Sequence, residues 1–228
     1  MNTTEVATMQ DTAYDIICSN AIFDIVKTDE RFLGLLTLAR FVNALRFCQQ
    51  AGIDGKMSTG YTDARSDVNS FLFSASILYE GFLLVEKLAT NFRDVDSFKS
   101  GFGVLLRDKK VSLMRKSVLN RMRNKFVFHF DQVVAKEALA DFDLPEYKFA
   151  SGVGKAAGEM VFVLADEAVI NYLLQPAPGE SNDSLTKRYK EILQDTTEVI
   201  STFLDAAEKL MGDVLKDMGF KVTFREGK

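Results

Sequence analysis

The segment Ser184–Met218, SLTKRYKEILQDTTEVISTFLDAAEKLMGDVLKDM, decides the class of fold. Its apolar residues return every three or four positions, as they do along one face of an α-helix. A helix of this length, beginning at Glu180 or Ser184, needs other helices to cover its apolar face. The positions that form this face are Leu185, Tyr189, Ile192, Leu193, Val199, Phe203, Ala206, Leu210, Val214 and Leu215.

The same spacing predicts further helices upstream, and the first 144 residues contain no proline to interrupt them. Asp29 is positioned to cap the second helix, and Ala51-Gly52 is a suitable place for that helix to end. Residues 54–62 contain glycine and serine and are typical of a loop. The expected helices are 13–26, 29–51, 63–91, 94–106 (a short helix or a pair of turns) and 111–130.

The pattern changes between the last two long helices. Residues 146–153 and 158–164 carry Tyr, Phe and Val around a glycine-rich turn, which predicts a β-hairpin, and residues 166–174 predict a short helix. This insert, at about 145–178, is too small to hold a core of its own. Residues 220–224 alternate and predict a small edge strand. We therefore expect one domain over 1–228, an all-α bundle of four to six helices with a small β-hairpin insert near 146–164.

Composition excludes several kinds of chemistry. The chain has 228 residues and a net charge of −4, which argues against indiscriminate binding of polyanions. The two cysteines, Cys18 and Cys48, form no CxxC pair, and a lone histidine cannot complete a Cys/His zinc site. There is also no Walker A, GxGxxG or GxSxG sequence. No apolar run reaches the roughly 18–20 residues of a membrane span, and the N-terminus lacks the pattern of a signal peptide. We expect a cytoplasmic protein with reduced thiols, no metal, no cofactor and no membrane partner.

One segment of this acidic chain is strongly basic. Eight lysines and arginines lie between Arg107 and Lys125, and Asp108 is the only acidic residue among them. Such a segment can attract phosphate groups, and we take Arg115, Lys116, Arg121 and Lys125 as candidate phosphate-binding residues. The alternative is an ordinary solvated helix face.

The basic segment runs directly into the only histidine, through Arg123-Asn124-Lys125-Phe126-Val127-Phe128-His129. Histidine is the side chain best suited to proton transfer near neutral pH. Arginine presents a permanently charged fork that matches a phosphate. Together they suit the cleavage of RNA without a metal, with Asn124 orienting either group or donating to a phosphate oxygen.

Arg123, Asn124 and His129 resemble the signature of the HEPN superfamily, an Arg followed by a polar residue and, after four to six intervening residues, a His near a helix end. The resemblance implies Arg123 and His129 as catalytic residues, Asn124 as the supporting polar residue, and a homodimer whose two motifs line one cleft. Many HEPN proteins are metal-independent ribonucleases that act as toxins or in defence, with protein partners such as antitoxins. Here five residues separate Arg123 from His129, and Asp131 stands where a subset of these toxins has a tyrosine.

Three other interpretations remain open. On an ideal helix His129 falls on an apolar stripe with Val111, Val118, Met122 and Phe126, which is typical of a structural histidine. The chain can also be a non-catalytic module for helical dimerisation or protein interaction, or a binder of a small molecule in the bundle cleft. Two residues in the middle of the third helix bear on the site. Glu80 either forms a buried ion pair with the arginines or points outward, and Gly81 permits close helix contact.

Overall fold

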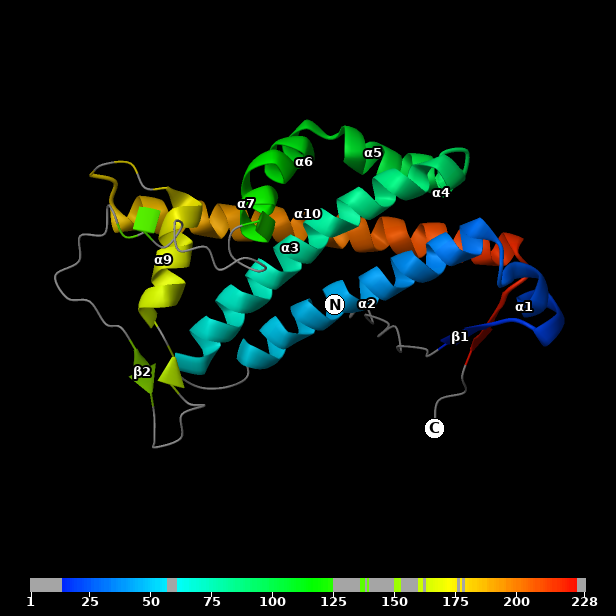
Figure 1. The fold of residues 1–228 in the computed structure, drawn as a ribbon, viewed down its shortest axis with the longest axis horizontal. Helices are drawn as coiled ribbons and strands as arrows, with labels where there is room; N and C mark the ends of the chain where they lie inside the picture. The colour runs from blue at the N-terminus through cyan, green and yellow to red at the C-terminus, as the bar shows by residue number, and fades with distance from the viewer. Residues whose placement is uncertain are drawn as a thin grey trace, which may run out of the picture.

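Three long helices form the body of the protein: α2 (Glu30–Lys56), α3 (Tyr61–Phe92) and α10 (Asn182–Asp217). The computed structural model describes residues 14–56, 61–124, 136–137, 139, 150–152, 160–161, 163–175, 177 and 179–224. Helix α2 packs along α3, and α10 lies against both (Figure 1). Among the described residues the architecture is an all-α bundle with a small β-hairpin, as predicted.

The ends of two long helices are capped by side chains. Asp29 accepts hydrogen bonds at Oδ1 from the backbone N–H groups of Arg31 (2.8 Å) and Phe32 (3.0 Å), so the predicted cap of α2 is confirmed. Ser181 accepts from the backbone N–H of Ser184 at 3.3 Å and caps α10 in the same way.

A group of shorter elements covers α3 and α10. They are α4 (Asp96–Ser100), α5 (Phe102–Arg107), α6 (Lys109–Met114), the π-helix η1 (Arg115–Leu119) and α7 (Asn120–Met122). In Figure 1 this green segment arches over α3 and α10 and returns toward the middle of α3. The segment therefore brings the basic residues to the middle of the bundle.

The small elements of β structure lie at the two ends of the bundle. Strand β1 (Tyr14–Ile17) pairs antiparallel with β4 (Lys221–Phe224), which confirms the predicted C-terminal strand. Strands β2 (Ser151–Gly152) and β3 (Met160–Val161) form the short antiparallel hairpin near 146–164, and helix α9 (Val163–Leu174) follows it. Both ends are visible in Figure 1.

Three predicted boundaries are wrong. Residues 14–17 form β1, and only Asn20–Val26 form the helix α1, because β4 provides the first residues with a pairing partner from the distant C-terminus. Helix α2 continues past Gly52 to Lys56, and α3 begins at Tyr61, so residues 54–56 and 61–62 of the predicted loop are helical, and residues 57–60 lie outside the described residues. The helix predicted over 111–130 is interrupted by the π-helix η1.

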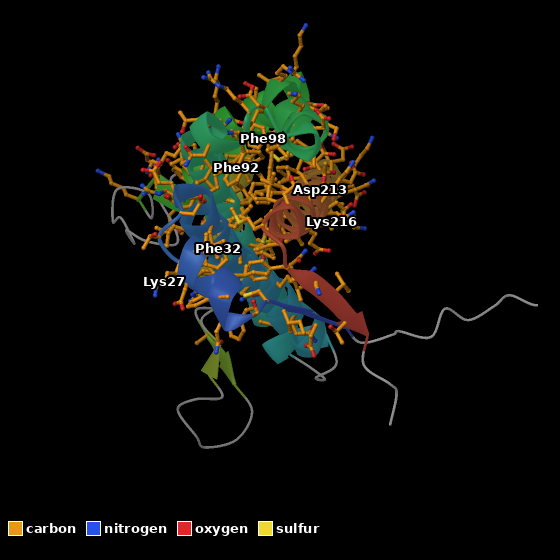
Figure 2. The ribbon with its side chains drawn as sticks, turned by 90° about the vertical axis from the view of Figure 1, so that its right-hand side faces the viewer. Lys27, Phe32, Phe92, Phe98, Asp213 and Lys216 are labelled. Atoms are coloured by element: carbon orange, nitrogen blue, oxygen red, sulfur yellow. The ribbon has the colours of Figure 1, made fainter. Side chains whose placement is uncertain are left out.

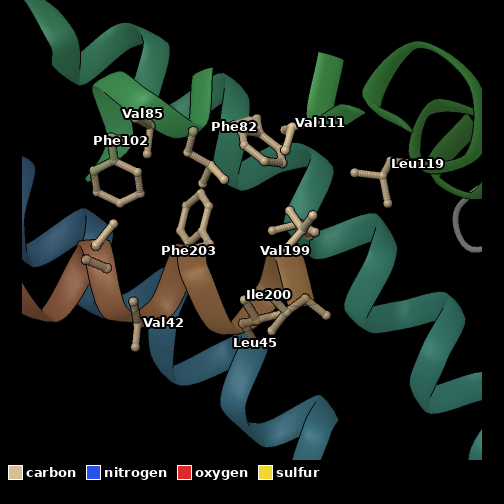
Figure 3. Packing of buried hydrophobic residues seen from close by; sticks show 14 of the residues in the cluster. Val42, Leu45, Phe82, Val85, Phe102, Val111, Leu119, Val199, Ile200 and Phe203 are labelled. Carbon is tan, nitrogen blue, oxygen red and sulfur yellow. The ribbon is translucent and has the colours of Figure 1, made fainter. Parts of the chain in front are cut away.

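The core is centred on Phe203 of α10. Its ring centroid lies 5.2 Å from that of Phe41, 5.6 Å from that of Phe82 and 4.9 Å from that of Phe102. These partners come from α2, α3 and α5, so one buried ring joins four helices (Figure 3). Such pairs add about 0.5–1.5 kcal/mol each beyond the burial of apolar area.

The apolar stretch Val68–Phe92 of α3 is long and apolar enough to cross a membrane by length and composition alone. The expectation that no apolar run reaches this length is therefore wrong by composition, but 56% of the 18-residue apolar segment within this stretch is buried against the rest of the protein. A helix at the centre of a bundle has the same composition, because its neighbours cover it on several sides.

Gly81 permits the close contact between α2 and α3. A Cβ atom at this position would overlap the ring of Phe41, whereas one at Gly212 on α10 would meet no atom within 4 Å. The close helix contact expected at Gly81 is therefore confirmed.

These two glycines make a matched pair of substitutions. Gly81→Ala should lower the free energy of unfolding, because overpacking costs about 1–3 kcal/mol and the gain in helix propensity is only about 0.5–1 kcal/mol. Gly212→Ala should raise it by about 0.5–1 kcal/mol. Urea unfolding followed by circular dichroism checks both, and a stabilised Gly81→Ala variant would contradict the close packing.

Candidate functional site

The basic segment begins with a capped helix. Asp108 accepts a hydrogen bond at Oδ1 from the backbone N–H of Val111 at 3.1 Å, and the first residues of α6 follow it. The only acidic residue of the segment therefore has a structural role at the helix start. Arg107, Lys109 and Lys110 around it are exposed.

The π-helix changes which residues of this segment face the core. A π-turn holds more residues than an α-turn, so the residues within it are displaced around the axis relative to an ideal α-helix. Val111 and Met122 are buried as the ideal projection predicts, but Leu119 is fully buried and Val118 only partly so. The projection that placed Val118 on the buried stripe is thus corrected, and Arg123 and Asn124 lie in a second π-type turn.

Arg123 is held from α3. Its Nε donates to Oε1 of Glu80 at 2.7 Å, and the two side chains are 36% and 42% exposed. Glu80 therefore forms an ion pair with an arginine, but this pair is partly exposed and not buried as predicted. Coulombic attraction between groups this exposed contributes little to stability, on the order of 0–1 kcal/mol, so the pair mainly orients the guanidinium.

Two asparagines extend this contact. Nη1 of Arg123 donates to Oδ1 of Asn124 at 2.6 Å, and Nδ2 of Asn124 donates to Oδ1 of Asn120 at 2.5 Å. Asn124 thus contacts Arg123 directly, and its supporting role in the site stays a prediction. Asn120 was not predicted, although its spacing of four residues from Asn124 places the two side chains together on a helix.

Arg115 of η1 is also held by residues of α3. Its Nη2 donates to Oε1 of Glu86 at 2.6 Å, and its guanidinium carbon lies 4.8 Å from the centroid of the Phe82 ring. The side chain is only 18% exposed. Arg115 is therefore bound to the bundle rather than free to take a phosphate.

Arg121 caps the end of α9. Its Nη1 donates to the carbonyl oxygen of Leu173 at 3.0 Å and, at a longer 3.4 Å, to that of Tyr172. Arg188 of α10 donates to the next carbonyl, that of Leu174, at 2.6 Å. The chain then leaves the helix at Gln175, whose φ of 47° lies in the left-handed region. Arg121 thus anchors the short helix that follows the hairpin.

Among the described candidates for phosphate binding, Lys116 is the exposed one. Lys110, another lysine of the basic segment, has an acidic partner. Its Nζ donates to Oδ1 of Asp195 at 2.6 Å, and this hydrogen bond raises the pKa of Lys110. Two predicted residues, Lys125 and His129, lie outside the described residues. The structure brings together Arg123 and Asn124 and adds Glu80 and Asn120 to them.

A polar groove lies where the C-terminal ends of α3 and α10 meet. It has a volume of about 620 Å³, and Figure 2 shows Asp213 and Lys216 of α10 near Phe92 on this side. From Glu80 to Asn91 at the groove is about 16 Å along α3, so the groove is separate from Arg123. Its lining residues are Arg31, Asn91, Asp94, Val95, Asp96, Asp213, Lys216 and Asp217.

Within the described part of the chain, no group of three or more His, Cys, Asp or Glu residues is arranged to hold a metal ion. Comparison of the chain with protein-family models, with curated proteins and with solved structures finds no match. The residues around Arg123 are therefore the candidate functional site.

The cap by Arg121 gives a test of its structural role. Arg121→Ala should lower the free energy of unfolding by about 1–3 kcal/mol, because buried carbonyl groups lose a charged donor. Lys116→Ala removes the same charge from an exposed position and should change it by less than about 0.5 kcal/mol. Thermal unfolding of both variants checks this, and equal stabilities would show that the cap contributes nothing.

Proposed function

We propose that this chain is a HEPN-like, metal-independent endoribonuclease or RNA-binding protein that acts as a homodimer, a component of a toxin, stress or defence system. The observation that carries the proposal is the state of Arg123. Its guanidinium is fixed through Nε and Nη1, its side chain is 36% exposed, and no described residue accepts from Nη2. A guanidinium held in this way can bind a phosphate without first becoming ordered.

The reaction proposed for this site is an internal transfer at phosphorus. The 2′-oxygen of RNA forms a bond to the phosphorus, and the bond to the 5′-oxygen breaks, which leaves a cyclic phosphate and a 5′-hydroxyl. His129 takes the proton of the 2′-hydroxyl or supplies one to the leaving oxygen, and the second copy's motif supplies the other group. Arg123 stabilises the charge that develops on the phosphate oxygens.

The second candidate function is a non-catalytic interaction module, and the outer face of α2 favours it. Leu36 and Phe47 are 50% and 75% exposed, and their spacing of 11 residues places them on the same side of the helix, three turns apart. Exposed apolar side chains along one helix face are typical of surfaces that bind a partner.

The nuclease proposal predicts RNA cleavage that persists in EDTA. Arg123→Ala and His129→Ala should each reduce the cleavage rate by at least about 100-fold, since each removes a group that acts in the transition state. Lys209→Ala removes an exposed charge from α10 and should leave the rate unchanged. Cleavage of labelled single-stranded RNA is measured on gels, with circular dichroism to verify folding. Intact RNA after incubation with the wild-type protein would refute catalysis.

Sedimentation separates the two functions. If the α2 face joins two copies or binds a partner, Phe47→Glu should abolish that association, because a buried carboxylate lacks a partner. Arg123→Ala should leave association through this face intact. A wild-type protein that sediments only as a monomer at micromolar concentration would contradict the homodimer in either function.

A further inference from the structure

The carboxylate of Glu80 fixes which atoms donate and which accept in the chain of hydrogen bonds through Arg123. A carboxylate only accepts, so Arg123 must donate from Nε to Glu80 across their 2.7 Å contact. A guanidinium only donates, so the amide oxygen of Asn124 must be the atom that faces Nη1 at 2.6 Å. The orientation of the Asn124 amide follows, with its NH2 group directed to Asn120.

This orientation passes on to Asn120. Because Nδ2 of Asn124 donates at 2.5 Å, the atom of Asn120 that receives it must be the amide oxygen. The NH2 group of Asn120 is thereby left as a donor, and no described residue accepts a hydrogen bond from it. Nη2 of Arg123 likewise has no acceptor among the described residues. One hydrogen-bonded group therefore presents two donors that no described residue uses, one of them permanently charged.

We propose that Asn120 is a further RNA-binding residue, whose Nδ2 donates to a phosphate oxygen of the RNA that Arg123 binds. This inference rests on the function proposed above. Asn120 precedes Arg123 by three residues, so the two side chains lie on neighbouring positions of the helix surface. A phosphate offers only acceptors, which matches two donors and no acceptor.

The test uses a substitution that removes the donor and keeps the shape. In Asn120→Asp one carboxylate oxygen still accepts from Asn124, and the other replaces the NH2 group and repels a phosphate. Asn43→Asp adds the same charge at an exposed position on α2 and is the matched control. Asn120→Ala removes the donor without adding a charge. Circular dichroism and thermal unfolding establish that each variant is folded.

Binding is measured by fluorescence anisotropy with labelled single-stranded RNA that carries 2′-O-methyl groups and cannot be cleaved. We expect Asn120→Asp to weaken affinity by at least about tenfold, and Asn120→Ala by about three- to tenfold, as for loss of a hydrogen bond to a charged group. Asn43→Asp should change affinity by less than about twofold. If both Asn120 variants bind as the control does, Asn120 is not a binding residue, although wild-type binding and the proposed function stand.

A wild-type protein that neither binds nor cleaves RNA refutes the proposed function, and a second measurement then decides the anion site. In ¹⁵N-labelled protein, inorganic phosphate should shift the side-chain amide signals of Asn120 and the Nε–Hε signal of Arg123. Shifts of both signals in the absence of RNA binding would keep these residues as an anion site for another ligand. Unchanged signals would overturn the inference.

Discussion

The ring of Phe203 packs against Phe41, Phe82 and Phe102, with centroid distances of 5.2, 5.6 and 4.9 Å. These contacts hold α2, α3 and α5 on α10 at one point. The position of α5 in turn determines where the shorter elements that follow it lie. Phe82 has a second neighbour, since the guanidinium of Arg115 lies over its ring. The core contact and the first contact of the basic segment thus share one aromatic ring.

Helix α3 connects this core to the candidate site. It is the most apolar of the long helices, yet it carries Glu80 and Glu86 on a side that the basic segment covers. Each glutamate pairs with one arginine, Glu86 with Arg115 and Glu80 with Arg123. The two pairs differ in what surrounds them. Arg115 is largely covered, whereas Arg123 is open enough to meet a ligand and has asparagines beside it.

Several features of the site were predictable from local pattern. The basic segment, the position of Asn124 beside Arg123 and the close contact at Gly81 all follow from residue type and spacing. Asn120 could have been found from its spacing to Asn124, because residues four apart on a helix are neighbours. By contrast, nothing in the sequence near Arg121 indicates that its partners are the last carbonyls of α9, about 50 residues away in the chain.

The sequence by itself determined the class of fold, because apolar residues recur at helical spacing along most of the chain, so that each helix has mainly other helices to bury its apolar face. It also determined most helix positions, the cap at Asp29 and the strand at 221–224. Tertiary structure alone decided which cations of the basic segment are available. A charge pattern in the sequence does not reveal which groups will pair with the cations. In the structure Arg115 pairs with Glu86, Lys110 pairs with Asp195, and Arg121 donates to the last carbonyls of α9. The π-helix was likewise decided by packing, since it rotates Leu119 into the core at a place where an ideal helix would have turned Val118 inward.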